Sequence, residues 1–163
     1  MNREILFRAK SVQTGRWISG YYFEDEDSKS YIGYMSKKRY IPDTRDWDIV
    51  EYYENNPTYN WVFVKEEVVS ETVGQFTGQY DANKKKIYEG DIIQYDGDYD
   101  AIDGFTRSFS EKAIVLWDED YCGFVCKVIG DESGDSYSWL EYRENPDLTI
   151  IGNIYDNSEL LKA

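Results

Sequence analysis

The chain contains no histidine among its 163 residues, and this absence narrows its chemistry more than any other feature. Histidine is the commonest general base and the commonest metal ligand in proteins. Serine–histidine–aspartate catalysis, cysteine–histidine catalysis and histidine-based zinc sites are therefore excluded within this chain. An enzyme would have to work through carboxylates, tyrosine, lysine or a carboxylate-bound metal. We therefore predict a protein that is not an enzyme and that holds no cofactor.

Cysteine and long apolar runs are also scarce. The two cysteines, Cys122 and Cys126, are four residues apart, and on an extended strand about 13 Å separates such positions, which is beyond the reach of a disulfide. The longest apolar runs have about five residues, as in 113–117, whereas ~20 are needed to cross a membrane. The first residues also lack the pattern of a secretion signal. These features favour a reduced, intracellular protein with no membrane partner.

Negative charge is what the chain has in excess. Its 32 acidic and 18 basic residues give a net charge of −14. This charge repels phosphate backbones and anionic membrane surfaces, so direct binding to nucleic acid is not expected. It favours partners with a basic surface, by steering and by complementarity. The alternative is that the acidic surface provides solubility alone.

Aromatic residues are the second excess, with 16 tyrosines and five tryptophans. They occur with valine and isoleucine at a period near two, which predicts strands rather than helices. Part of this aromatic content must lie in the core. The remainder is typical of a protein–protein interface, because tyrosine supplies a large and rigid contact area.

The order of the predicted elements indicates an all-β fold. Strands are expected at 4–9, 16–23, 31–35, 61–64, 72–78, 86–95, 113–117, 124–129 and 148–155. Residues 46–53 predict one or two helical turns, 157–161 a short terminal helical turn, and 96–110 a long polar loop. We therefore expect a small, curved, barrel-like (SH3-like) core around residues 68–129, with N-terminal β-hairpins packed on it and a short C-terminal helical turn. This gives a single domain over 1–163, which would divide into an N-terminal lobe (1–66) and a core lobe (67–163).

One acidic segment is a candidate metal site. Asp96, Asp98, Asp100 and Asp103 are spaced like the first ligands of an EF-hand loop. Ala101 stands where that loop requires glycine, and Arg107 stands where it requires a bidentate glutamate. The alternative is a solvated loop, so the four aspartates are kept as candidates and no metal is predicted.

Several segments together resemble the signature of the YopX-like family, a group of small phage and prophage proteins. The resemblance lies in 71–78 and 81–92, supported by 7–10 with 14–17, by 115–118, and by 151–157 with 159–161. The family-like residues that we single out are Thr72, Gly74, Thr77, Gly78, Asp81, Asn83, Ile87, Tyr88, Glu89, Gly90, Asp91, Gly152, Asn153 and Tyr155. Lys84 stands where the family usually has glycine, so the left-handed turn position falls on Lys84 or shifts to Asn83.

The resemblance implies a β-rich fold, a phage or prophage origin and expression in the cytoplasm of a bacterial host. It carries no established activity and no agreed catalytic residues, so none is transferred. Our leading hypothesis is a non-enzymatic phage accessory protein that binds a host or phage protein through an acidic, tyrosine-rich surface. Three alternatives remain: a nucleic-acid mimic that inhibits a host nucleic-acid enzyme, a carboxylate–metal enzyme, and a self-assembling structural protein that forms homo-oligomers.

Overall fold

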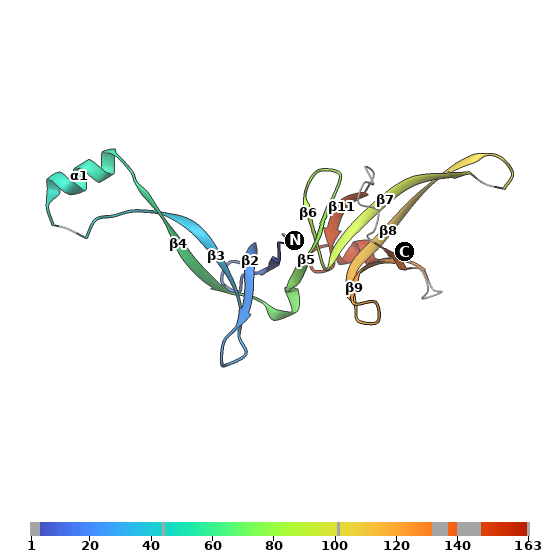
Figure 1. The fold of residues 1–163 in the computed structure, drawn as a ribbon, viewed down its shortest axis with the longest axis horizontal. Coiled ribbons are helices and arrows are strands. Elements are labelled where there is room, and N and C mark those ends of the chain that lie inside the picture. The colour runs from blue at the N-terminus through green and yellow to red at the C-terminus, as the bar shows by residue number, and fades with distance from the viewer. Residues whose placement is uncertain (1–3, 44, 101, 132–136, 140–147, 163) are drawn as a thin grey trace.

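The computed structural model describes residues 4–43, 45–100, 102–131, 137–139 and 148–162, and the chain is mostly β-strand over them (Figure 1). The strands are β1 (Phe7–Lys10), β2 (Trp17–Glu24), β3 (Ser30–Arg39), β4 (Tyr59–Glu67), β5 (Gly74–Tyr80), β6 (Lys86–Tyr88), β7 (Asp91–Asp100), β8 (Thr106–Asp118), β9 (Gly123–Val128), β10 (Tyr137–Trp139) and β11 (Leu148–Asn153). The helical elements are α1 (Trp47–Asn55) and the 3-10 helices η1 (Ser70–Thr72) and η2 (Ser158–Leu161). The predicted all-β class, the N-terminal hairpins and the C-terminal helical turn are confirmed.

The strands form two antiparallel sheets. The first has six strands in the order β4-β3-β2-β1-β5-β6, and the second has five in the order β10-β9-β8-β7-β11. Both sheets have outer strands, so the described strands make an open, barrel-like pair of sheets and not a closed barrel. The sheets divide between β6 and β7. The proposed lobes, 1–66 and 67–163, stay a prediction.

Each sheet has its own small core. In the first sheet, the alternation of strands β1 and β3 turns Ala9 and Ile32 inward, where they pack with Val68. In the second, Ile93 and Val115 pack together with Ala113, Cys126 and Ile87. Because Ile87 comes from β6, this last contact joins the first sheet to the core of the second. No helix among the described residues has the length and apolarity to cross a membrane.

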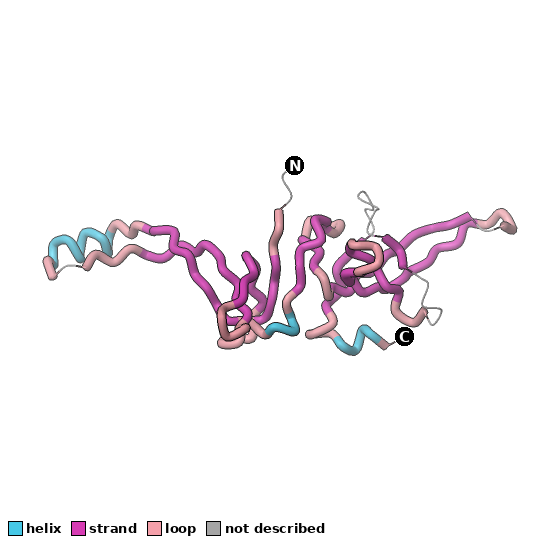
Figure 2. Tube along the Cα trace, turned by 60° about the horizontal axis from the view of Figure 1, so that its bottom comes forward, coloured by secondary structure: helices cyan, strands magenta, loops and turns pink. Residues whose placement is uncertain are grey.

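Two long hairpins extend beyond the sheets. Strands β3 and β4 stay paired as far as Arg39 and Tyr59, whereas β2 pairs with β3 only up to Gly33. Strands β7 and β8 stay paired as far as Asp100 and Thr106. We call the described residues of 34–64 the first arm and those of 96–110 the second arm. Figures 1 and 2 show these arms at opposite ends of the molecule, with α1 at the end of the first arm.

The prediction of a long loop over 96–110 was wrong. Residues 96–100 and 106–110 continue β7 and β8 and pair in regular register. The segment is polar because the two-stranded ribbon has water on both faces, so it lacks the apolar alternation of a half-buried strand. The polarity of this segment therefore indicates that both of its faces are exposed, and it does not exclude a strand.

The two thiols should differ in reactivity. Cys126 lies in the second core, and burial raises the pKa of its thiol to about 12, whereas Cys122 is exposed. Since the thiolate is the reacting species, we expect Ellman's reagent to modify one thiol of the folded protein at pH 8 and both in urea. Cys122→Ser should leave no fast-reacting thiol. Equal rates for both thiols in the folded protein would contradict the burial of Cys126.

Candidate functional site: two arms and their anchors

The carboxylate of Asp91 forms a buried ion pair between the N-terminal strand and the β6–β7 turn. Its side chain is 1% exposed, Arg8 Nη2 donates to Oδ1 at 2.5 Å, and the Tyr88 N–H donates to Oδ2 at 2.8 Å. The Arg8 guanidinium lies over the rings of Trp17 and Tyr88, with centroid distances of 4.8 and 4.9 Å. Burial raises the pKa of Asp91 above its usual value, against the lowering effect of Arg8. The ion pair is enclosed by these two aromatic rings and links β1 to the β6–β7 turn. We call it the first anchor.

A second anchor attaches the turn after β11 to strands β1 and β2. The Asp156 carboxylate accepts hydrogen bonds from Lys10 Nζ, from Trp17 Nε1 at 2.6 Å and from Asn153 Nδ2 at 3.0 Å. These donors, the Lys10 ammonium first, lower the pKa of Asp156 to about 2. The Tyr155 ring packs against Trp17 with a centroid distance of 6.0 Å. Arg8 and Trp17 thus link the two anchors into one cluster.

The β5–β6 turn is held by the buried side chain of Asp81. Its Oδ1 accepts the N–H groups of Asn83 and Lys85 at 2.9 and 2.8 Å, and its Oδ2 accepts the N–H of Ile150 on β11 at 3.3 Å. The left-handed position is Lys84, with φ of 61°, so it does not shift to Asn83. One carboxylate therefore closes the turn and fixes it to the second sheet.

Two of the predicted glycines allow close approach of neighbouring groups. A Cβ on Gly74 would lie 2.4 Å from the backbone oxygen of Glu89, and one on Gly152 would lie 2.6 Å from Oδ1 of Asn157. Position 74 needs glycine because the neighbouring atom is backbone, whereas a Cβ at position 152 would displace the Asn157 side chain from its hydrogen bond with the Asn153 N–H. Gly152 also sits at an irregularity in the β7–β11 pairing.

The other predicted residues also lie in turns or cores. Thr72 Oγ1 accepts the Lys10 N–H at 2.9 Å, and Thr77 Oγ1 donates to the Ile87 carbonyl at 3.0 Å. Gly78 and Gly90 have positive φ angles of 88° and 81°. The family-like residues therefore lie in turns and cores, and Asp81, Asp91 and Tyr155 among them make contacts that join the two sheets.

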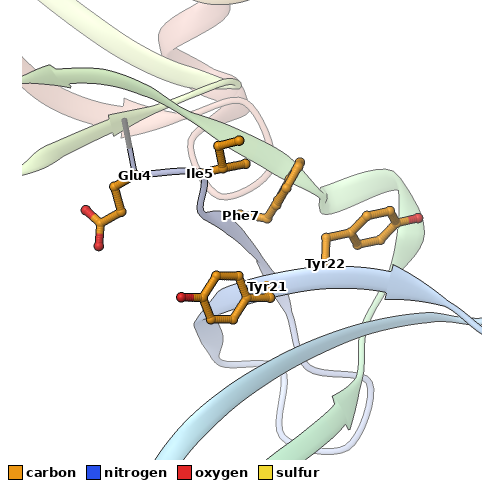
Figure 3. Close-up of a pocket in the computed structure, with 5 residues that line it drawn as sticks. All are labelled: Glu4, Ile5, Phe7, Tyr21 and Tyr22. Atoms are coloured by element: carbon orange, nitrogen blue, oxygen red, sulfur yellow. The ribbon is translucent and has the colours of Figure 1, made fainter. Parts of the chain in front are cut away.

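A shallow pocket opens between the residues before β1 and strand β2 (Figure 3). It has a volume of about 490 Å³ and is lined by Glu4, Ile5, Phe7, Tyr21 and Tyr22. The Phe7 and Tyr22 rings pack at 5.5 Å, and the Glu4 carboxylate is paired with Lys86 at 2.7 Å. The lining offers apolar contact but no second carboxylate for acid–base chemistry.

One face of the first arm carries exposed aromatic and cationic side chains. The register places Met35 opposite Phe63, Lys37 opposite Trp61 and Arg39 opposite Tyr59, and alternate residues of a strand share a face. Trp61 and Phe63 are 61% and 60% exposed, and Lys37 Nζ lies 5.1 Å from the Trp61 ring centroid. We call these six residues the stripe.

The end of the first arm presents the helix α1. Arg39 Nη2 donates to the carbonyls of Tyr53 and Glu54 at 3.3 and 3.2 Å, where a cation also complements the helix dipole. The Tyr40 ring packs edge-on against Tyr53 at 5.3 Å. These contacts hold α1 on the arm, while Trp47 stays 81% exposed.

The second arm carries the aspartates that were considered as metal ligands. Asp96, Asp98 and Asp100 alternate along β7, so they share one face and are spread along the strand. Asp103 pairs with Arg107 at 2.5 Å. Over the described ranges, no three aspartate, glutamate or cysteine side chains come together as a metal site would require. We call the three strand aspartates the ladder.

These features define a class: a β-protein of two open antiparallel sheets, joined by buried polar anchors and extended by two arms. The chain belongs to the YopX family, because the family model described as YopX protein matches residues 6–162. The predicted resemblance is therefore confirmed. The family fits an accessory protein without assigning an activity.

Among solved structures, the chain is similar to protein EF1440 from Enterococcus faecalis. The TM-score is 0.55 at 16% sequence identity, over 99% of this chain and 100% of the other. Similarity at this identity shows the fold alone. No curated protein matched the chain.

Sequence reasoning missed both the stripe and several anchor residues. Arg8, Lys10 and Trp17 lay in family-like segments, but nothing linked them to Asp91 and Asp156, which are up to 146 positions away. The alternation of Tyr59, Trp61 and Phe63 was a visible signal for an aromatic face. Only the register of β4 with β3 shows that cationic side chains lie on the same face as these rings.

Proposed function

We propose that this protein is a non-enzymatic phage accessory protein that binds a host or phage protein with a basic surface. The observation that best supports this proposal is the helix α1, which is acidic and aromatic and is held at the end of the first arm. In this proposal, α1 is the acidic, tyrosine-rich contact surface that the composition predicts.

The exposed apolar side chains of α1 support a protein partner. Trp47, Ile49 and Tyr52 are 81%, 41% and 60% exposed on a helix of nine residues. An isolated helix of this length is marginal in water, so its apolar side chains gain most by burial against another molecule. Tryptophan and tyrosine are also the residues that most often dominate binding energy at interfaces.

The charge of this region indicates which surface would fit. Residues 43–54 contain five carboxylates and one arginine. Of these carboxylates, Glu51 and Glu54 are exposed on α1. A basic partner surface would be steered to this end of the molecule and would lose affinity as salt rises.

A role outside catalysis is supported by the surroundings of the carboxylates. Asp91 is enclosed with Arg8, Asp81 is occupied by backbone N–H groups, and Glu4 at the pocket is paired with Lys86. None of these three is poised as a general base beside an open site.

The test is an affinity capture from bacterial host lysate at low salt, followed by calorimetry with each purified captured protein. Trp47→Ser/Tyr52→Ser should weaken binding at least tenfold, and so should Glu51→Lys/Glu54→Lys. Tyr121→Ser removes an exposed tyrosine from the β8–β9 turn and should bind like the wild type.

Equal binding by the wild type and both α1 variants would overturn the assignment. Competition by excess DNA for the same partner would instead identify nucleic-acid mimicry.

A further inference from the structure

Apart from Arg39, whose guanidinium donates to carbonyls at the end of α1, the stripe on the first arm has no covering element among the described residues. It combines large exposed rings with Lys37 and Arg39, although the chain as a whole has a net charge of −14. Lys65, one pair closer to the body, adds a cation on the same face, with Nζ 4.7 Å from the Tyr31 ring centroid. A surface that is cationic and aromatic fits an acidic, β-structured partner.

The second arm offers such a surface on the same molecule. The ladder residues Asp96, Asp98 and Asp100 lie opposite Ser110, Ser108 and Thr106, so these three pairs carry only carboxylates and hydroxyls. The next pair toward the body, Gln94 with Lys112, shares the face and places one cation at the base of the arm. The end of the arm adds exposed apolar surface at Ile102 and Phe105. Carboxylates and apolar contacts therefore occur together, as cations and rings do on the stripe.

The spacing of charges matches because both surfaces are β-ribbons. Successive same-face residues of any strand are about 6.7 Å apart. Lys37 and Arg39 on β3 therefore repeat at the same interval as the carboxylates of the ladder. Two ribbons packed face to face can place each cation beside a carboxylate without bending either strand.

The geometry requires that the two surfaces belong to different molecules. The arms point to opposite ends of the molecule, so the stripe cannot reach its own ladder (Figure 1). A two-fold contact of stripe with stripe would oppose Lys37 and Arg39 to like charges, and a contact of ladder with ladder would oppose carboxylates. The favourable pairing is the stripe of one copy with the ladder of the next.

We propose that the protein associates head to tail, with the stripe of each copy bound to the ladder of another copy. Such a heterologous contact closes into a ring or continues as a filament, depending on the rotation between copies. Each contact uses one face of a short ribbon, so its area falls in the range of weak interfaces. The association should therefore depend on concentration and on salt. It does not require the partner proposed for α1.

Sedimentation equilibrium of the purified protein tests the proposal with two single-surface variants. The stripe variant is Lys37→Ser/Trp61→Ser, which leaves Arg39 in place because it supports α1. The ladder variant is Asp98→Ser/Asp100→Ser. The control is Glu26→Ser/Lys29→Ser, which removes one charge of each sign from the exposed β2–β3 turn.

At low salt, the wild type and the control should have at least twice the mass of one chain, rising with concentration, and should return to one chain at high salt. Each single-surface variant alone should have the mass of one chain. An equimolar mixture of the two should reach twice that mass and no more, because one intact stripe meets one intact ladder. This recovery also shows that both variants are folded.

Three results would overturn the proposal. One is a wild type with the mass of one chain at every concentration. Another is a ladder variant that associates like the wild type, which would mean that stripe meets stripe. The third is a wild type that stays single but binds labelled oligothymidine, with the binding lost in the stripe variant alone, because the stripe would then be a stacking surface for nucleic acid.

Discussion

Replacing Arg8 by methionine is expected to lower the free energy of unfolding at pH 7 by about 3–5 kcal/mol, because the carboxylate of Asp91 is left buried without its counter-charge. Methionine keeps most of the side-chain volume, so the effect isolates the charge. Since whole domains are stable by only ~5–15 kcal/mol, this is a large fraction of the total. Urea unfolding followed by tryptophan fluorescence measures it.

A double-variant cycle separates the charge effect from simple loss of packing. Asparagine at position 91 is neutral and still offers an oxygen to the Tyr88 N–H. Arg8→Met/Asp91→Asn should therefore recover at least about half of the stability that Arg8→Met loses. Lys86→Met, which breaks the exposed pair with Glu4, serves as the control and should cost less than about 1 kcal/mol.

The same variant should change the pH dependence of stability. Burial already raises the pKa of Asp91, and removal of Arg8 takes away the largest opposing effect. A raised pKa in the folded state contributes stability below the unfolded value of about 3.9, and that stability is lost as pH rises through the folded pKa. The deficit of Arg8→Met relative to the wild type should therefore grow as pH rises from the unfolded value of about 3.9 toward neutrality. A deficit that stays constant, or that is equal in the double variant, would mean that Arg8 acts through packing alone.

The sequence predicted the strands whose inner faces are apolar, and it failed where strands leave the body. Residues 113–117 and 124–129 were predicted because they are short apolar runs, and Val115 and Cys126 from these runs lie in the second core. Residues 96–100 were missed because a ribbon with water on both faces has no apolar alternation. The pattern of apolar residues therefore indicates which face of a segment is buried. It indicates a strand only where one face of that strand is buried.

The anchors could be predicted as residues but not as a cluster. Asp91 and Asp156 lie in family-like segments, yet their partners Arg8 and Lys10 could be assigned only from the fold. The stripe was missed for the same reason, since pairing Lys37 with Trp61 requires the β3–β4 register. Both cases depend on contacts between residues far apart in sequence, which a single sequence does not specify.

The residues of the anchors also decide how the arms are held. The second arm continues the end of β7 far from Asp91, and β7 pairs with β11, which is attached to the β5–β6 turn through Asp81. The first arm grows from β3, whose inner residue Ile32 packs with Ala9 of β1. These contacts connect the bases of the two arms, whose surfaces lie at opposite ends of the molecule, as head-to-tail association would require.

Asp81→Ala is expected to destabilise the protein by about 3 kcal/mol, because three backbone N–H groups lose a charged acceptor and the turn loses its attachment to β11. The side chain is 5% exposed, so water cannot replace all three hydrogen bonds. Asp81→Asn keeps an acceptor oxygen and should lose less. Urea unfolding of the wild type, Asp81→Ala and Asp81→Asn measures the order of their free energies of unfolding.

Asp25 provides a matched control within the same chain. Its Oδ1 accepts the N–H groups of Asp27 and Lys29 at 3.0 Å, the same local arrangement that Asp81 makes with Asn83 and Lys85. The differences are that its Oδ2 accepts from the Tyr31 hydroxyl at 3.1 Å rather than from the other sheet, and that the hairpin turn is open, so water replaces a lost acceptor. Asp25→Ala should therefore have a much smaller effect than Asp81→Ala. Equal losses would mean that turn closure alone matters, and that the bond from Ile150 to Asp81 does not hold the two sheets together.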